Sequence, residues 1–231
     1  MLNIEHVEVM NFEAAVRGMR NPMNSWEKSD SGYGCGYDEN DRVLEWCKDC
    51  DSAIECDKRY SIGDNDLALM KKLVKAGTDH RKFLRQIVVS MDITAPLFWW
   101  KEFDTYKVGT VANSCSTMHK MHARPLEISD FSVETVEGVD FAKEACEKYI
   151  DIMNSARNAF LEFEDKECWR IMIEMLPTSY NQKRTITMNY EVCLNIYNAR
   201  KNHKLKEWHT LCDEILKLPF FKSICEDIIQ K

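Results

Sequence analysis

The stretch Gln86-Ile-Val-Val-Ser-Met-Asp-Ile-Thr-Ala-Pro-Leu-Phe98 decides the fold. Apolar residues occupy every second position from Ile87 to Ile93, which is the period of a β-strand with one buried face. Ala95-Pro96 follows, and a proline in the first turn is typical of a helix start. The sequence therefore predicts a strand that runs directly into a helix rich in aromatic residues over 97–103.

The segments on either side of this stretch are mostly helical in pattern. Upstream, spacing and punctuation predict a strand over 4–9, a helix over 12–20 with Asn11 as its N-cap, a loop over 28–42 and a helix from about 67 that Gly77 ends. Downstream, apolar residues at helical spacing predict helices over about 140–165, 168–176, 189–200 and 205–216. In the first of these, one apolar face is expected to include Phe141, Tyr149, Ile152, Met153 and Phe160. The predicted elements, many helices and few strands, indicate an α+β fold. No linker is visible, so we predict one domain over 1–231.

Composition excludes some functions. The chain has 231 residues, of which 45% are hydrophobic and 30% charged, with a formal net charge of −7. A negatively charged molecule binds polyanions poorly, so no nucleic-acid partner is expected. No apolar run approaches the roughly 20 residues that span a bilayer, and the first residues lack a signal-peptide pattern. The sequence predicts a cytoplasmic protein without a membrane partner.

Ten cysteines are present, and in a reducing compartment they are expected to be free thiols. Four of them, Cys35, Cys47, Cys50 and Cys56, lie close together, and zinc is one alternative for them. Their spacing matches no standard pattern of two short pairs, so we predict no metal site.

Two segments taken together carry a family resemblance. The first is the opening stretch, with its strand and Ala95-Pro96. The second contains Leu176-Pro177, Thr187-Met188-Asn189, Asn195 and Arg200, followed by a helix with Trp208. In this order they resemble the two conserved blocks of the flavin-dependent (X-type) thymidylate synthases. The helices at Ala14–Arg20 and Leu69–Gly77 resemble two further family segments in the matching order.

The resemblance implies fold, chemistry and assembly. It implies an α+β fold with a central, mainly antiparallel sheet and flanking helices, as one domain of the thymidylate synthase complementing protein type. The implied reaction is the methylation of dUMP in dTMP biosynthesis, in which FAD passes a hydride after one-carbon transfer to uracil C5. NADPH and methylenetetrahydrofolate are the implied co-substrates of such a methyltransferase. The implied partners are a small nucleotide and three further copies of the chain, in a homotetramer whose sites are shared between subunits.

The family's signature motif is largely rewritten in this chain. Counting forward from Ala95-Pro96 places it over Thr105–Thr117. Its Arg-His-Arg becomes Thr105-Tyr106-Lys107, its two serines become Thr110 and Cys115, its Asn-Glu becomes Ala112-Asn113 and its last arginine becomes Thr117. The upstream glutamine becomes Glu102. Arginine grips a phosphate with two parallel bonds, whereas lysine offers one point charge, so the family's mode of holding phosphate is altered here.

The resemblance assigns candidate residues by position. As cofactor-binding residues it gives Asn189, Asn195, Tyr106 and Lys107, and as substrate-binding residues Arg200, Thr110, Asn113 and Cys115. Cys115 is also the candidate catalytic residue, because a cysteine thiolate is a strong nucleophile. Lys183 and Arg184 offer compensating positive charge.

Each assignment has a structural alternative. One cysteine among ten is usually a small apolar filler, so Cys115 alternatively lines a pocket or the core. Asn189 and Asn195 alternatively cap a helix or lie on the surface. Arg200, near a helix C-terminus, complements the helix dipole. Trp99 and Trp100 stack on a ligand or, more commonly, belong to the core.

Three functional hypotheses remain at this point. The chain is a flavin enzyme that acts on a pyrimidine nucleotide, or a divergent relative that binds another nucleotide or performs a related modification. In the third, it is a non-catalytic relative that keeps the fold and the assembly but has lost the standard reaction.

Overall fold

The computed structural model describes residues 2–37, 43–46, 59–136 and 138–229. Contacts within the chain define two compact units, and each unit is built from three separate stretches. The first unit comprises Met1–Val7, Ser90–Thr187 and Leu205–Leu211, and the second comprises Glu8–Val89, Met188–Lys204 and Cys212–Lys231. The prediction of one domain stays a prediction, and each unit is described by itself.

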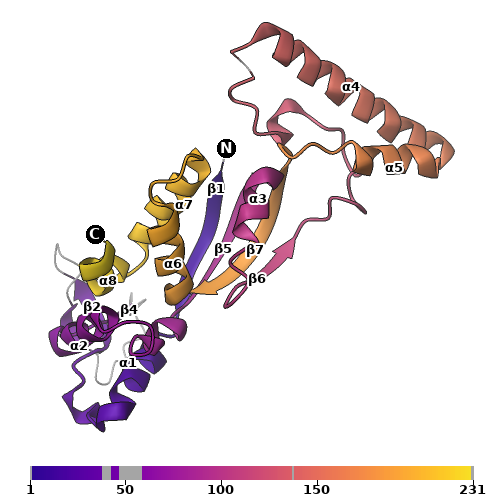
Figure 1. The fold of residues 1–231 in the computed structure, drawn as a ribbon. Helices are drawn as coiled ribbons and strands as arrows, with labels where there is room; N and C mark the ends of the chain where they lie inside the picture. Colours follow the sequence, from indigo (N-terminus) through magenta and orange to yellow (C-terminus); the bar gives the residue numbers. More distant parts are fainter. Residues whose placement is uncertain (1, 38–42, 47–58, 137, 230–231) are drawn as a thin grey trace. The chain divides into compact units, whose positions relative to one another are not determined.

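The described residues contain α-helices and two β-sheets (Figure 1). The α-helices are α1 (Phe12–Arg20), α2 (Asp64–Lys75), α3 (Leu97–Phe103), α4 (Asp140–Phe163), α5 (Lys166–Glu174), α6 (Tyr190–Arg200), α7 (Lys206–Lys217) and α8 (Phe221–Ile229). The strands are β1 (Asn3–Met10), β2 (Gly32–Tyr37), β3 (Val43–Trp46), β4 (Arg59–Ser61), β5 (Val88–Pro96), β6 (Val111–Ser114) and β7 (Asn181–Asn189). No helix among these residues is long and apolar enough to cross a membrane.

The sheet of the first unit has the strand order β1-β5-β7-β6, with β6 antiparallel to β7. The strand and aromatic helix predicted from the opening stretch are both present as β5 and α3. The junction between them differs from the prediction. Pro96 has φ −68° and ψ 149°, which is extended backbone, so it ends the strand and the helix begins at Leu97. The fixed φ of proline fits an extended residue as well as a first helical turn.

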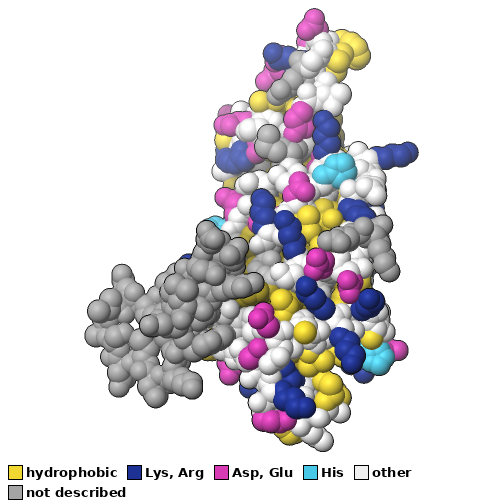
Figure 2. Space-filling model, turned by 90° about the vertical axis from the view of Figure 1, so that its left-hand side faces the viewer, with side chains coloured by type: hydrophobic (Ala, Val, Ile, Leu, Met, Phe, Trp, Pro, Cys, Tyr) yellow, Lys and Arg dark blue, Asp and Glu magenta, His cyan; other side chains and the backbone are white. Residues whose placement is uncertain are grey.

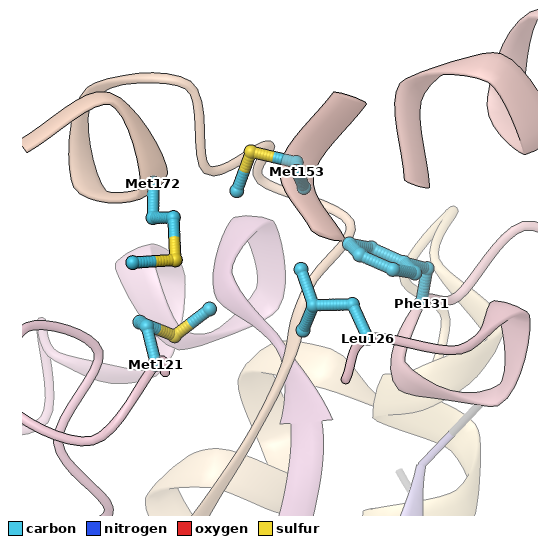
Figure 3. Close-up of a cluster of buried hydrophobic side chains, with 5 residues drawn as sticks. All are labelled: Met121, Leu126, Phe131, Met153 and Met172. Carbon is cyan, nitrogen blue, oxygen red and sulfur yellow. The ribbon is translucent and has the colours of Figure 1, made fainter. Parts of the chain in front are cut away.

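The α4 and α5 helices of the first unit pack against each other around a small core of their own. The buried side chains of this core point toward one another in Figure 3 and are Met121, Leu126, Phe131, Met153 and Met172. The long apolar face predicted for α4 is therefore buried only in part. Phe141 is 78% exposed and Ile152 is 52% exposed, because the short α5 covers only one side of a helix of 24 residues.

The second unit contains the small sheet β3-β2-β4. The prediction of a loop over 28–42 is wrong for Gly32–Tyr37, which form the central strand β2 of this sheet. Glycine weakens a strand because it has no side chain to pack. In β2, however, antiparallel pairing with β3 on one side and β4 on the other supplies backbone hydrogen bonds. Cys47, Cys50 and Cys56 lie outside the described residues, so the absence of a metal there stays a prediction.

Three helix ends of the second unit show how local sequence sets its boundaries. Asn11 precedes α1 as predicted, but with φ 76° and no side-chain cap bond; its Nδ2 instead donates to the Gln86 carbonyl over 2.8 Å. Gly77, after α2, has φ 100°, a left-handed conformation that glycine adopts at no steric cost. The prediction placed the last helix at 205–216, whereas the structure adds α8 after it.

Candidate functional site

A polar face of the first unit's sheet brings together residues from three strands. The β5 side chains alternate, so Met91 and Ile93 are buried while Asp92 lies on the opposite face. The Thr185 hydroxyl donates to Asp92 Oδ1 over 2.6 Å. Asn113 on β6 is the cross-strand partner of Thr185. Because directly paired residues share a face of a sheet, Asn113 lies on this polar face.

Lys183 is held on the same face by two carboxylates. Its Nζ lies 3.0 Å from Asp92 Oδ2 and 3.6 Å from Glu5 Oε2. The Thr185 hydroxyl, followed by Lys183, lowers the pKa of Asp92, and the hydrogen bond to Asp92 raises the pKa of Lys183. The positive charge of Lys183 is therefore largely neutralised within the unit.

Arg184 is also engaged inside the first unit. Its Nη1 lies 2.7 Å from Asp104 Oδ1, its Nε donates to Gln182 Oε1 over 2.9 Å, and its guanidinium carbon lies 4.2 Å above the Trp100 ring. An arginine held by an ion pair, a hydrogen bond and a stacked ring has little freedom to reach a ligand. Both cations that sequence reasoning offered as compensating charge are thus already paired.

Cys115 follows β6 and is fixed through its backbone. Its carbonyl accepts from Gln182 Nε2 over 2.7 Å, and its N–H donates to the Lys183 carbonyl over 2.9 Å. Its side chain is exposed. The structure therefore places this thiol at the rim of β6 and outside the hydrophobic core.

The segment before β6 carries the other candidate residues of the first unit. Lys107 is exposed, and within the described residues it makes no ion pair. Thr110 is half-buried, and its Oγ1 has no hydrogen-bond partner among the described residues. An orphaned buried hydroxyl costs about 1–3 kcal/mol, which a hydrogen-bonding ligand would recover. The Thr110 hydroxyl is therefore the group in this segment with an unmet hydrogen bond, and Lys107 and Asn113 are exposed donors near it in sequence.

A cluster of aromatic side chains, most of them next in sequence to Lys107 and Thr110, packs together in the first unit. Trp99, Trp100 and Trp208 are fully buried and pack on Phe103, so the tryptophans belong to the core. Tyr106, which is half-buried, lies with its ring centroid 5.9 Å from that of Trp208. Tyr106 is the aromatic residue of this group that has exposed surface for a ligand.

The remaining candidates lie on α6 in the second unit. Asn189 caps this helix, because its Oδ1 accepts from the Val192 N–H over 3.1 Å. Asn195 is exposed and Arg200 is half-buried in the last turn. Glu191, in the first turn, pairs with Arg81 at 3.0 Å. The capping alternative for Asn189 is thus present in the structure, and its Nδ2 group remains a donor.

Sequence reasoning missed Asp92 and Thr185 as site residues. The alternation of β5 showed that Asp92 faces away from the core, but the pairing of β7 with β5 and β6 was not visible. On the face shown in Figure 2, basic and acidic side chains are interspersed, with no large area of one sign. The visible face therefore offers an anion no extended basic surface.

Comparison with known proteins identifies the fold. No family model and no curated protein sequence matches the chain. Among solved structures, thymidylate synthase X (ThyX) from Helicobacter pylori with FAD and dUMP matches 100% of this chain and 99% of its own, with TM-score 0.63 and 16% identity. A second structure of flavin-dependent thymidylate synthase ThyX from the same organism, also with FAD and dUMP, has TM-score 0.61 and 14% identity, covering 97% of this chain and 96% of its own. The chain has the α+β fold of the flavin-dependent thymidylate synthases, which confirms the predicted resemblance and fold class.

Proposed function

We propose that the chain binds FAD and a pyrimidine nucleotide, and carries out dUMP methylation or a related modification. The observation that carries this proposal is the likeness, over the full length of both chains, to proteins solved with FAD and dUMP. A second support is local. In the segment before β6 and on the polar face, Lys107, Thr110 and Asn113 offer donor groups at positions that the family resemblance assigns to ligands, and the Thr110 hydroxyl has no partner among the described residues.

The first unit supplies most of the proposed nucleotide contacts. Lys107 offers its charge to a phosphate, and Thr110 and Asn113 offer a hydroxyl and an amide to the carbonyl and N–H groups of a pyrimidine. Cys115 lines the same edge and is the candidate catalytic residue. Tyr106 and Lys107 are assigned to the flavin as well, with the tyrosine ring as a stacking surface.

The α6 helix supplies a further set in the second unit. Asn189 and Asn195 are assigned to the flavin and Arg200 to the substrate phosphate, which arginine recognises through paired donors. Bound FAD would supply hydride transfer, with NADPH and methylenetetrahydrofolate as co-substrates by resemblance. We also propose a homotetramer, in which residues of the two sets need not come from one copy of the chain.

A specific observation favours a second candidate function. Lys183 and Arg184 are both neutralised by carboxylates, and the signature motif lacks its arginines. A relative that keeps the fold and the assembly, with an altered substrate or no reaction, accounts for this loss of free positive charge.

Copurification of flavin tests the proposal directly. We expect the purified chain to carry FAD, or to take it up when added, as seen in its visible absorption spectrum. Growth of a thymidine-requiring cell then separates dUMP methylation, which restores growth, from a related modification, which does not. A colourless protein that takes up no FAD supports the second candidate instead.

Two further measurements bear on particular assignments. Arg200→Ala should weaken dUMP binding, while Lys204→Ala, an exposed cation four residues later, should not. Equal affinities in the two variants would remove Arg200 from the site.

Light scattering should give a tetramer, and a monomer would count against a site shared between subunits.

A further inference from the structure

Two adjoining cavities open along α1 in the second unit. Their volumes are about 280 Å³ and 570 Å³, and both are lined by Glu13, Arg17, Tyr33 and Tyr60. We call them together the α1 cavity. Volumes of this order are those of small-molecule sites. None of the residues assigned to flavin or nucleotide above lines the α1 cavity.

One wall of the α1 cavity is aromatic. Tyr33 on β2 and Tyr60 on β4 are cross-strand partners, with ring centroids 5.2 Å apart at 80°. Phe12 stacks on Tyr60 at 6.3 Å and 6°. Trp26 is 49% exposed, and its indole N–H is fixed to Asn21 Oδ1 over 2.7 Å. Phe12 is buried, whereas Tyr33 is 44% exposed, so Tyr33 and Trp26 are the rings with accessible surface on which a planar ligand can stack at low entropic cost.

The α1 helix contributes two charged side chains to the lining of the α1 cavity. Glu13 and Arg17 lie one turn apart on α1 and are exposed. A glutamate four residues before an arginine ordinarily pairs with it. Within the described residues, however, neither side chain makes a hydrogen bond or an ion pair. The α1 cavity therefore presents one strong acceptor and one forked donor, about a helical turn apart.

A buried carboxylate outside the lining holds three residues of the α1 cavity in place. Asp66, which is fully buried, accepts from Arg20 Nε over 2.6 Å, from Ser29 Oγ over 2.7 Å and from Ser31 Oγ over 2.6 Å. Arg20, Ser29 and Ser31 all line the cavity. Their side chains are fixed by these bonds, so the cavity is formed before a ligand arrives.

We propose that the α1 cavity binds a planar nitrogen heterocycle of the guanine type. Its ring stacks on Tyr33 and Trp26. Glu13 accepts from adjacent ring and amino N–H groups, and Arg17 donates to the carbonyl and ring-nitrogen acceptors on the neighbouring edge. Adenine is a poorer match, because it turns an unprotonated ring nitrogen toward the carboxylate. This site shares no residue with the proposed flavin and nucleotide site, and the proposal does not depend on that site.

Calorimetric titration of the full-length chain with guanosine tests the proposal. We expect binding that is about tenfold tighter for guanosine than for adenosine. Glu13→Gln and Arg17→Gln should each weaken guanosine binding by about tenfold, the loss of one charge-assisted contact. Tyr33→Leu should weaken it similarly, while Tyr33→Phe, which keeps the ring, should not.

The control for charge is Lys143→Gln, on the exposed surface of α4, which changes net charge as Arg17→Gln does and should leave guanosine binding unchanged. Glu13 and Arg17 are exposed, so their variants should unfold at the temperature of the parent chain. The proposal is overturned if guanosine does not bind, if adenosine binds equally well, or if Glu13→Gln and Arg17→Gln bind guanosine as Lys143→Gln does.

Discussion

The Thr185 hydroxyl donates a 2.6 Å hydrogen bond to Asp92, and the same carboxylate forms a 3.0 Å ion pair with Lys183. This arrangement orients Asp92 across the sheet from β5 toward β7. It also withdraws the charge of Lys183 from any anion that approaches the polar face, so that Lys107 is left as the exposed cation of the candidate segment. The distribution of charge on this face therefore leads to a prediction on nucleotide affinity.

If dUMP binds at the polar face, Lys107→Gln should weaken its binding by about tenfold, because one charge-assisted hydrogen bond to phosphate contributes roughly 1.5 kcal/mol. Asp92→Asn should strengthen binding, because it releases Lys183. Titration of dUMP into the three proteins, by calorimetry at low salt, measures both changes. Thr185→Val serves as the control that removes the hydrogen bond but keeps the carboxylate charge. Lower affinity in Asp92→Asn would contradict this account of Lys183.

Asp66→Asn should destabilise the second unit by about 3 kcal/mol, because it leaves Arg20 buried without its counter-charge. Burial raises the pKa of Asp66, but hydrogen bonds from Ser31, Ser29 and Arg20 outweigh it, so the net pKa is lowered. A lowered folded-state pKa stabilises the fold in full above the unfolded value of about 3.9 and is lost as pH falls through the folded value. The stability difference between the parent and Asp66→Asn should therefore shrink below about pH 4.

Denaturant unfolding at several pH values checks this prediction. Asp64→Asn is the matched control, because Asp64 lies on the same helix and is exposed. It should change stability by only a few tenths of a kcal/mol. A parent–variant difference that stays constant down to acid pH would show that Asp66 is not ionised in the way described.

Trp99→Phe and Trp100→Phe should differ although the two residues are neighbours on α3. The Trp100 indole N–H donates to the Gln182 carbonyl over 2.9 Å, whereas the Trp99 N–H is buried and has no partner among the described residues. Removing an unsatisfied donor recovers part of its desolvation cost of about 1–3 kcal/mol. Trp99→Phe should thus be less destabilising than Trp100→Phe by about 1–2 kcal/mol. Equal losses in chemical unfolding would indicate that Trp99 also has an acceptor.

Sequence alone predicted the elements in which the spacing of apolar residues agrees with the Asn, Pro or Gly residues expected at the ends of the element. The alternation of β5, the run of α1 between Asn11 and Asn21-Pro22, and the end of α2 before Gly77 are all present. The strand β2 was missed because its glycines give no alternation of apolar and polar side chains. Its pairing also depends on β4, which lies more than twenty residues later in the chain. Helix α8 was missed because it follows Pro219 closely and is short.

The sequence nominates candidate residues one by one, but it does not predict how they are arranged in space. Spacing from Ala95-Pro96 selected Lys107, Thr110, Asn113 and Cys115, and these lie in and beside one short strand. The ion pairs of Lys183 with Asp92 and of Arg184 with Asp104 were not predictable, because the partners are distant in sequence. Such ion pairs follow from strand pairing, which local patterns do not encode.

Cys115 should react with iodoacetamide before Cys193, Cys212 and Cys225. Its side chain is exposed, while Cys193, Cys212 and Cys225 are buried. Burial raises the pKa of Cys212 to about 11 and that of Cys225 to about 12, so at about pH 8 roughly one Cys212 in a thousand is a thiolate.

Peptide mapping of the alkylated chain by mass spectrometry should show Cys115 modified about a hundredfold faster than Cys212 or Cys225. The Cys115 thiol is accessible to the reagent, whereas the other two thiols are buried and have raised pKa values. In denaturant the three rates should converge, which controls for differences in peptide detection. Addition of dUMP should slow the alkylation of Cys115 if this thiol lines the nucleotide site. Unchanged alkylation at saturating dUMP would separate Cys115 from that site, and rapid alkylation of Cys212 in the folded chain would contradict its burial.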